Sequence, residues 1–191
     1  YSYSPATVET WVAHQRSAFM QQQITWLINT LNAVPSDHQV IIVTHSPIRD
    51  GAISNSSFVI KQRNGNLISG ILEAFQNARK YSSRGWSWAQ SDPQMLDEGD
   101  FSAQANVDFS GKTTGRIIAV LSGHTHEDKD NVHNKVLYTQ TLDSLPGRCP
   151  TINRNIGDAT EDAWDIVTVD PTARKIYFSR YGAGNDRSYS Y

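Results

Sequence analysis

An apolar segment that runs directly into two histidines is the clearest structural signal of the chain: Ile117-Ile118-Ala119-Val120-Leu121-Ser122-Gly123-His124-Thr125-His126. A matching segment lies upstream, where Val40-Ile41-Ile42-Val43-Thr44 leads into His45. Short apolar runs of this kind are typical of strands that are covered on both faces. Open α/β sheets place their chemistry at the carboxyl ends of such strands. The two segments therefore predict an α/β fold that gathers His45, His124 and His126 at one sheet edge.

Periodicity predicts further helices and strands around these two segments. Apolar residues at steps of three and four predict one helix from about Ser17 to Ala33, with Trp26 widening its apolar face, and another from about Leu67 to Tyr81. A long irregular loop is expected from Ser82 to Asp100. Alternation then predicts a strand after Phe101, strands at Gly115–Leu121 and Lys135–Thr141, and a hairpin that pairs Trp164–Val169 with Lys175–Arg180. Without repeats or an evident linker, residues 1–191 are expected to form a single domain.

Composition excludes several classes of function. Seventeen basic and nineteen acidic side chains give a formal charge of −2. The sequence contains no basic stripe of the kind that binds nucleic acid. No apolar run approaches the ~18 residues of a membrane span. The single cysteine, Cys149, excludes an internal disulfide and a CxxC zinc cluster, and the cellular compartment stays open. Because the chain starts at Tyr1 without an initiator methionine, a processed or excised piece is expected.

The setting of His45, His124 and His126 points to a metal centre. Neutral imidazole binds zinc, iron, nickel and manganese, and its affinity is expected to weaken as the pH falls towards about 6. Residues i and i+2 of an extended segment lie about 6–7 Å apart on one side, which suits two rings facing neighbouring ions. Gly123 is expected to remove side-chain bulk where the backbone turns. His14, His38 and His133 stand among polar residues and are interpreted as surface positions.

Carboxylate ligands are scarce around the histidines. Glu127 and Asp128 follow them directly and are interpreted as solvated or supporting groups rather than bridging ligands. Arg148, Arg154 and Arg180 are able to contact a phosphate, but an arginine in a polar loop is more often solvated, and none is assigned that role.

These motifs carry a family resemblance. Two stretches, each after an apolar strand, resemble the C-terminal half of a calcineurin-like metallophosphoesterase: Thr44-His45-Ser46-Pro47 and Leu121-Ser122-Gly123-His124-Thr125-His126-Glu127. Two further parts are similar to the same family: the passage Gln23-Ile24-Thr25-Trp26-Leu27, and the final hairpin with its tail, Gly182-Ala183-Gly184-Asn185-Asp186-Arg187. The resemblance covers most of the chain.

The resemblance implies a two-layer β sandwich flanked by helices (αββα) with a dinuclear site at the strand ends. It implies two divalent ions, Mn, Fe or Zn, with His45 and His124 on one and His126 on the other. In such enzymes a metal-held hydroxide attacks the phosphorus of a phosphate ester, here a monoester or a diester.

The chain departs from the family in lacking the motifs Asp-Xaa-His, Gly-Asp-Xaa-Xaa-Asp and Gly-Asn-His-Asp/Glu, which supply the bridging Asp, a metal-binding Asn and the general-acid His. The chain is therefore expected to be the C-terminal part of the phosphoesterase domain, with no catalytic acid of its own. Its partner is expected to be the missing N-terminal half, in cis or as a separate chain. A sheet edge without its usual neighbour would also favour oligomers.

Two other interpretations remain open. One is a mononuclear zinc hydrolase that uses the three histidines alone, because three protein ligands and a water make a workable catalytic zinc site. The other is a non-enzymatic module on a degenerate phosphoesterase scaffold, which binds carbohydrate or a protein partner through Trp86-Ser87-Trp88.

Overall fold

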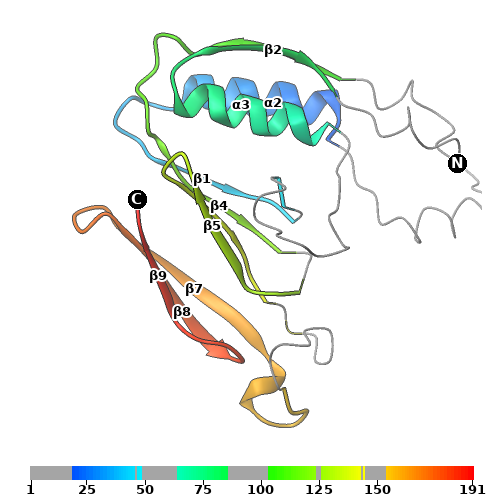
Figure 1. The fold of residues 1–191 in the computed structure, drawn as a ribbon, viewed down its shortest axis with the longest axis vertical. Coiled ribbons are helices and arrows are strands. Elements are labelled where there is room, and N and C mark those ends of the chain that lie inside the picture. Colours follow the sequence, from blue (N-terminus) through cyan, green and yellow to red (C-terminus); the bar gives the residue numbers. More distant parts are fainter. Residues whose placement is uncertain are drawn as a thin grey trace, which may run out of the picture. The chain divides into compact units, whose positions relative to one another are not determined.

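The computed structural model describes residues 19–45, 47–48, 64–85, 103–123, 126–142, 144 and 154–191 (Figure 1). These residues belong to two compact units, one built from the parts of the chain up to His38 and between Val59 and Arg116, the other from Gln39–Phe58 and Ile117–Tyr191. Each unit is described by itself below. The expectation of a single domain stays a prediction.

The first unit contains two helices and a two-stranded antiparallel sheet. The helices are α2 (Gln21–Ala33) and α3 (Gly65–Gln76), and the strands are β2 (Lys80–Arg84) and β3 (Gln104–Asp108). Helix α2 buries Ile24, Leu27 and Leu31, as their spacing predicts. Trp26 does not widen this face, because 65% of it is exposed.

Helix α3 is shorter than predicted, and a strand follows it. The helix ends at Gln76, and Ala78 adopts a left-handed φ of 48° that turns the chain. Residues 80–84 then form β2, where the sequence predicts the end of a helix and the start of a loop. Their polar sequence carries no strand signal of its own, and the strand forms by pairing with β3. The rest of the predicted loop, with Trp86 and Trp88, lies outside the described residues.

The second unit contains a four-stranded mixed sheet in the order β1-β4-β6-β5. Its strands are β1 (Val40–Val43), β4 (Ile117–Ser122), β5 (Lys129–His133) and β6 (Val136–Gln140). Strands β1, β4 and β6 run parallel, and β5 is antiparallel to β6. Strands β4 and β6 are almost wholly buried, whereas β1 lies at the edge and leaves 76% of Val43 exposed. Val40, Ile41 and Ile42 are partly buried, so β1 is less buried than β4 and β6, and its cover on both faces stays a prediction.

The hairpin of β5 and β6 was not predicted. Its two turn residues, Asn134 and Lys135, both have positive φ values, 49° and 63°, which is typical of a two-residue type I′ turn. Strand β5 reads Lys-Asp-Asn-Val-His, and this polar sequence hides it from a hydrophobicity pattern.

A three-stranded antiparallel sheet completes the second unit. Strands β7 (Ala163–Asp170), β8 (Lys175–Gly182) and β9 (Arg187–Ser190) form a meander, preceded by the short 3₁₀ helix η4 (Ala159–Glu161). The predicted hairpin is confirmed as β7 and β8, with the Asp170 carboxylate accepting hydrogen bonds from the amides of Thr172 and Ala173 in the turn. Strand β9 adds a third strand that the sequence analysis did not predict.

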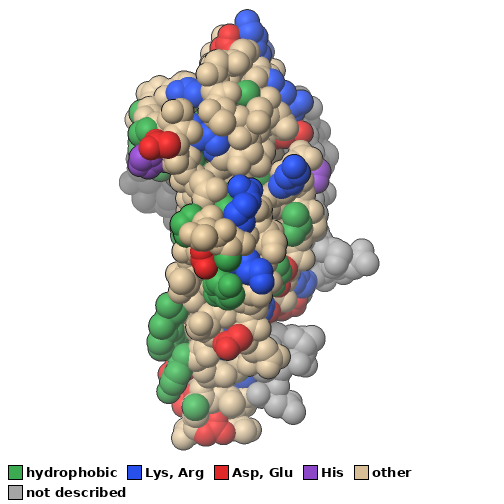
Figure 2. All heavy atoms as spheres, turned by 90° about the vertical axis from the view of Figure 1, so that its left-hand side faces the viewer, with side chains coloured by type: hydrophobic (Ala, Val, Ile, Leu, Met, Phe, Trp, Pro, Cys, Tyr) green, Lys and Arg blue, Asp and Glu red, His purple; other side chains and the backbone are tan. Residues whose placement is uncertain are grey.

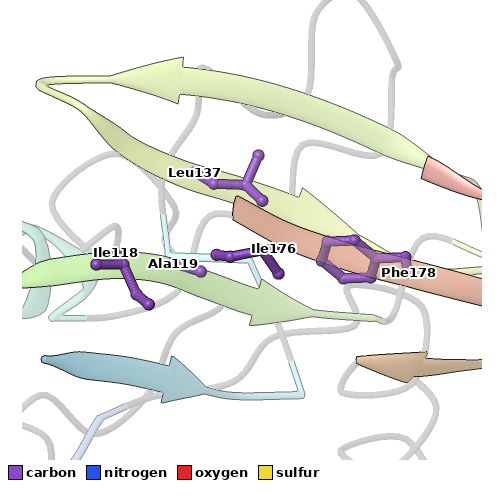
Figure 3. Packing of buried hydrophobic residues seen from close by; sticks show 5 residues of the cluster. All are labelled: Ile118, Ala119, Leu137, Ile176 and Phe178. Atoms are coloured by element: carbon purple, nitrogen blue, oxygen red, sulfur yellow. The ribbon is translucent and has the colours of Figure 1, made fainter. Parts of the chain in front are cut away.

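The two sheets of this unit pack against each other through a buried apolar cluster (Figure 3). Strand β4 contributes Ile118 and Ala119, β6 contributes Leu137, and β8 contributes Ile176 and Phe178. Burying a large side chain of this kind stabilises the fold by about 1.5–3 kcal/mol. Two packed sheets make the β sandwich that the family resemblance implies, and the α/β fold class is confirmed.

The surface carries charges of both signs. Basic and acidic side chains intermingle on the face drawn in Figure 2, in keeping with the formal charge of −2. None of the helices in the described parts of the chain is long and apolar enough to cross a membrane.

Candidate metal centre

The carboxyl ends of the three parallel strands lie side by side. Backbone hydrogen bonds continue the ladder beyond the strands themselves: the Thr44 amide donates to the Leu121 carbonyl at 3.0 Å, and the Gly123 amide donates to the His45 carbonyl at 2.9 Å. On the other side of β4, the Thr141 amide donates to the Ser122 carbonyl at 2.9 Å. The backbone of His45 is thus fixed beside Gly123, the residue that precedes His124 in the sequence.

The segment that follows β4 is held at this edge a second time. The carboxylate of Asp128 accepts a hydrogen bond from the backbone amide of Leu142, just after β6, at 2.9 Å. His124 and His126 therefore fall between two tie points, Gly123 beside β1 and Asp128 beside β6. His45 is exposed and His126 is half-buried, while His124 lies outside the described residues. The roles of the three histidines as metal ligands stay predictions.

His126 itself has a left-handed φ of 58°. The expected spacing of His124 and His126 depends on the backbone at residues 124 and 125, which lie outside the described residues, and it stays a prediction. Non-glycine residues rarely adopt this conformation, which is found most often in turns and functional sites. Within the described residues nothing requires a glycine at position 123 for space, because an added Cβ there would meet the His45 carbonyl oxygen at an ordinary 3.8 Å.

Asp128 is not a solvated carboxylate. It forms ion pairs with Arg180 and Arg187, which also bind Asp165 of β7. Burial, the largest single influence, acts to raise the pKa of Asp128. The hydrogen bonds from Arg180 and the Leu142 amide, together with the charges of both arginines, outweigh it and lower that pKa below its ordinary value. At neutral pH Asp128 is therefore ionised, and its carboxylate is bound by Arg180, Arg187 and the Leu142 amide.

The arginines considered as phosphate contacts are also engaged. All five N–H donors of Arg180 have protein partners, in Asp128, Asp165 and the carbonyl of Ala183. Arg154 donates to the backbone carbonyls of Thr160 and Glu161. Arg148 lies outside the described residues.

The ion cluster around Arg180 escaped the sequence analysis although a signal for it exists. Strand β8 alternates, and Ile176 and Phe178 point into the core. Arg180 is in phase with them, so its guanidinium falls at an inward position where a charge requires buried partners. Asp165, on the strand predicted to pair with β8, supplies one of them.

The chemistry of the donors fits a metal, but the described residues do not form a full ligand set. Imidazole suits zinc, iron and manganese. In the described part of the chain, which leaves out His124, no group of three or more His, Cys, Asp or Glu side chains lies together in a way that could hold an ion. The adjacent Glu127 is paired with Lys129 at 2.6 Å. Further ligands would have to come from residues other than Glu127 and Asp128.

The remaining predicted positions lie away from this edge or outside the description. His38 is exposed, and its ring lies 2.8 Å from the Asp37 carboxylate, as expected of a surface residue. His14, Trp86, Trp88 and Cys149 fall outside the described residues.

Comparison with known proteins supports the fold. The helices and sheets of the described residues make a mixed α/β protein. Among solved structures, the chain is similar to a dimetal phosphatase from Danio rerio, with a TM-score of 0.50 and 15% sequence identity. The match covers 91% of this chain but only 38% of the phosphatase. No family model and no curated protein matches the chain.

Proposed function

We propose that the chain contributes part of the active site of a metal-dependent phosphoesterase, with His45, His124 and His126 as ligands of two divalent ions, Mn, Fe or Zn. The three histidines hold metal by themselves, though weakly, and further ligands from outside the chain complete the site. The substrate is a phosphate monoester or diester.

The observation that carries the proposal is the backbone hydrogen bond from Gly123 to His45 at the carboxyl edge of β4 and β1. It joins the two histidine-bearing segments at the edge where α/β folds place their active sites. The likeness to a dimetal phosphatase supports the same function, because the shared fold extends over most of this chain.

The chain's own residues would orient the site rather than transfer protons. Divalent ions in such a centre supply Lewis-acid stabilisation of the charge on the phosphoryl oxygens. The β1–β4 ladder fixes the backbone of His45, and the tie from Asp128 to Leu142 fixes the far end of the segment that carries His126. No described residue of this edge is assigned as the general acid.

The first experiment measures bound metal. The purified chain is incubated with Mn²⁺ or Zn²⁺ at pH 7.5, separated by gel filtration and analysed for metal per chain. We expect the wild type to retain metal and His45→Ala, His124→Ala and His126→Ala to lose most of it, since each change removes one donor. His38→Ala is the matched control, because His38 is an exposed histidine paired with Asp37 and should leave the metal content unchanged.

The same samples distinguish the competing functions. Two ions per wild-type chain, with hydrolysis of a bis-aryl phosphodiester, support the dinuclear centre. A single ion lost on any of the three histidine changes indicates a mononuclear zinc site instead. A wild-type chain that retains no metal contradicts the proposal. Sugar binding that is lost in Trp86→Ala and Trp88→Ala would then favour the binding module.

A further inference from the structure

Four charged side chains form a buried cluster between the two sheets of the second unit. Asp165 lies on β7, Arg180 on β8, Arg187 at the start of β9, and Asp128 just before β5. The side chains of Arg180 and Asp165 are only 2% and 4% exposed, and those of Arg187 and Asp128 are 11% and 18% exposed. Two guanidinium groups and two carboxylates balance in charge, which is the condition for burying such groups.

Arg180 is the centre of this cluster. Its Nε and Nη2 donate to the two oxygens of Asp165 at 2.7 and 3.1 Å, and its Nη2 and Nη1 donate to the two oxygens of Asp128 at 2.7 and 3.0 Å. The fifth donor reaches the Ala183 carbonyl at 2.6 Å. A bidentate grip on two carboxylates at once requires the planar fork of arginine, and the ammonium of lysine cannot reproduce it.

The two carboxylates differ in what they are attached to. Asp165 belongs to the middle of a regular strand, whose backbone is already fixed by pairing with β8. Asp128 belongs to the irregular stretch between β4 and β5, two residues after His126 and its left-handed backbone. The hydrogen bond from the Leu142 amide fixes the same carboxylate from the other sheet. Asp128 thus connects the buried guanidinium of one sheet to the histidine segment of the other.

We propose that Arg180 is a positioning residue for the metal centre, acting through Asp128 to hold His126 in the conformation that binds an ion. This inference deepens the proposed function and rests on His126 being a ligand. Arg180 itself touches neither metal nor substrate.

A matched pair of variants of the full chain tests it. Asp128→Asn and Asp165→Asn both remove one negative charge that binds Arg180 and Arg187, and both keep the size of the side chain. Asp165 is the more deeply buried, so Asp165→Asn should destabilise the fold more. Asp128→Asn should weaken metal binding more, by about tenfold or above, as is typical when a supporting partner of a metal ligand is removed.

The probe is Co²⁺, whose affinity is measured by titration and whose visible absorption reports the coordination geometry. Thermal unfolding gives the stability of each variant. Amide hydrogen exchange of the metal-free chain gives the order of the segment from Gly123 to Asp130, independently of any metal. The proposal predicts that the two variants rank in opposite orders for stability and for Co²⁺ affinity. It also predicts faster exchange in this segment and an altered Co²⁺ spectrum for Asp128→Asn alone.

The inference is overturned if both variants lose Co²⁺ affinity in proportion to their loss of stability, or if Asp128→Asn binds as the wild type does. If Asp128→Asn does not fold, Arg180→Lys decides, because it keeps the charge and loses the fork: weakened Co²⁺ binding supports the inference and wild-type binding overturns it. If the wild-type chain binds no Co²⁺, both the proposed function and this inference are wrong. The wild type alone shows this outcome, so it cannot be confused with an effect of the variants.

Discussion

Replacing Arg180 by alanine tests how much of the second unit depends on the buried ion cluster. Removal of this side chain deletes five donated hydrogen bonds and leaves Asp128 and Asp165 with Arg187 as their remaining cationic partner. Taking one partner out of a buried ion pair destabilises a protein by about 3–5 kcal/mol, since it leaves a poorly compensated charge. Because Arg187 still contacts both carboxylates, we expect the lower end of this range, about 3 kcal/mol.

For a chain of this size, about 3 kcal/mol corresponds to a fall of roughly 6–12 °C in the unfolding temperature, which circular dichroism measures directly. The control is Arg79→Ala. Arg79 forms an ion pair with Glu73 at 3.1 Å, but the two side chains are 52% and 38% exposed, and such a pair contributes only about 0–1 kcal/mol. If Arg180→Ala lowers the unfolding temperature no more than Arg79→Ala does, the reasoning about the buried cluster is wrong.

Two further predictions concern acid stability and the glycines. Hydrogen bonds from the hydroxyl and the amide of Ser110 lower the pKa of Asp108 to about 2. The Asp108 carboxylate therefore stabilises the fold fully above its unfolded-state pKa of about 3.9, and this stabilisation is lost as the pH falls towards 2. Asp108→Asn should thus reduce the difference in urea stability between pH 6 and pH 3, and an unchanged difference would contradict the prediction. Gly182→Ala should destabilise the fold, because Gly182 has a φ of 84° and an added Cβ would overlap the Asp162 carbonyl. Gly123→Ala should unfold at the wild-type temperature, and equal unfolding temperatures for the two variants would refute the distinction.

The parts of the fold that the sequence predicted are those whose own residues carry the signal. The apolar runs of β1 and β4 predicted two strands, and their parallel pairing follows from the general behaviour of α/β folds. Strands β2 and β5 were missed because their residues are polar and their structure depends on a neighbour along the sheet. A strand that is defined by its partner rather than by its own pattern is not visible to a local reading of hydrophobicity.

The candidate site shows the same division. That His45 and the residues after β4 share one edge follows from the direction of the strands, and the hydrogen bond from Gly123 to His45 bears out this placement for the backbone. The left-handed conformation of His126 was not predictable, because it belongs to a segment whose far end is fixed by Asp128. The partners of Asp128 lie 14 residues away at Leu142 and 52 residues away at Arg180, so no local pattern encodes them.

The edge is therefore fixed by two structural features that act at different points. The β1–β4 ladder alone sets the backbone of His45 beside Gly123, within one sheet. The position of His126 depends in addition on Asp128, which connects that sheet to Arg180 in the other. A change that loosens the contact between the sheets should consequently disturb the His126 end of the centre and leave the His45 end in place. In the proposed centre, metal affinity should then be sensitive to Arg180, and this sensitivity would separate a site built on the whole sandwich from one built on a single loop.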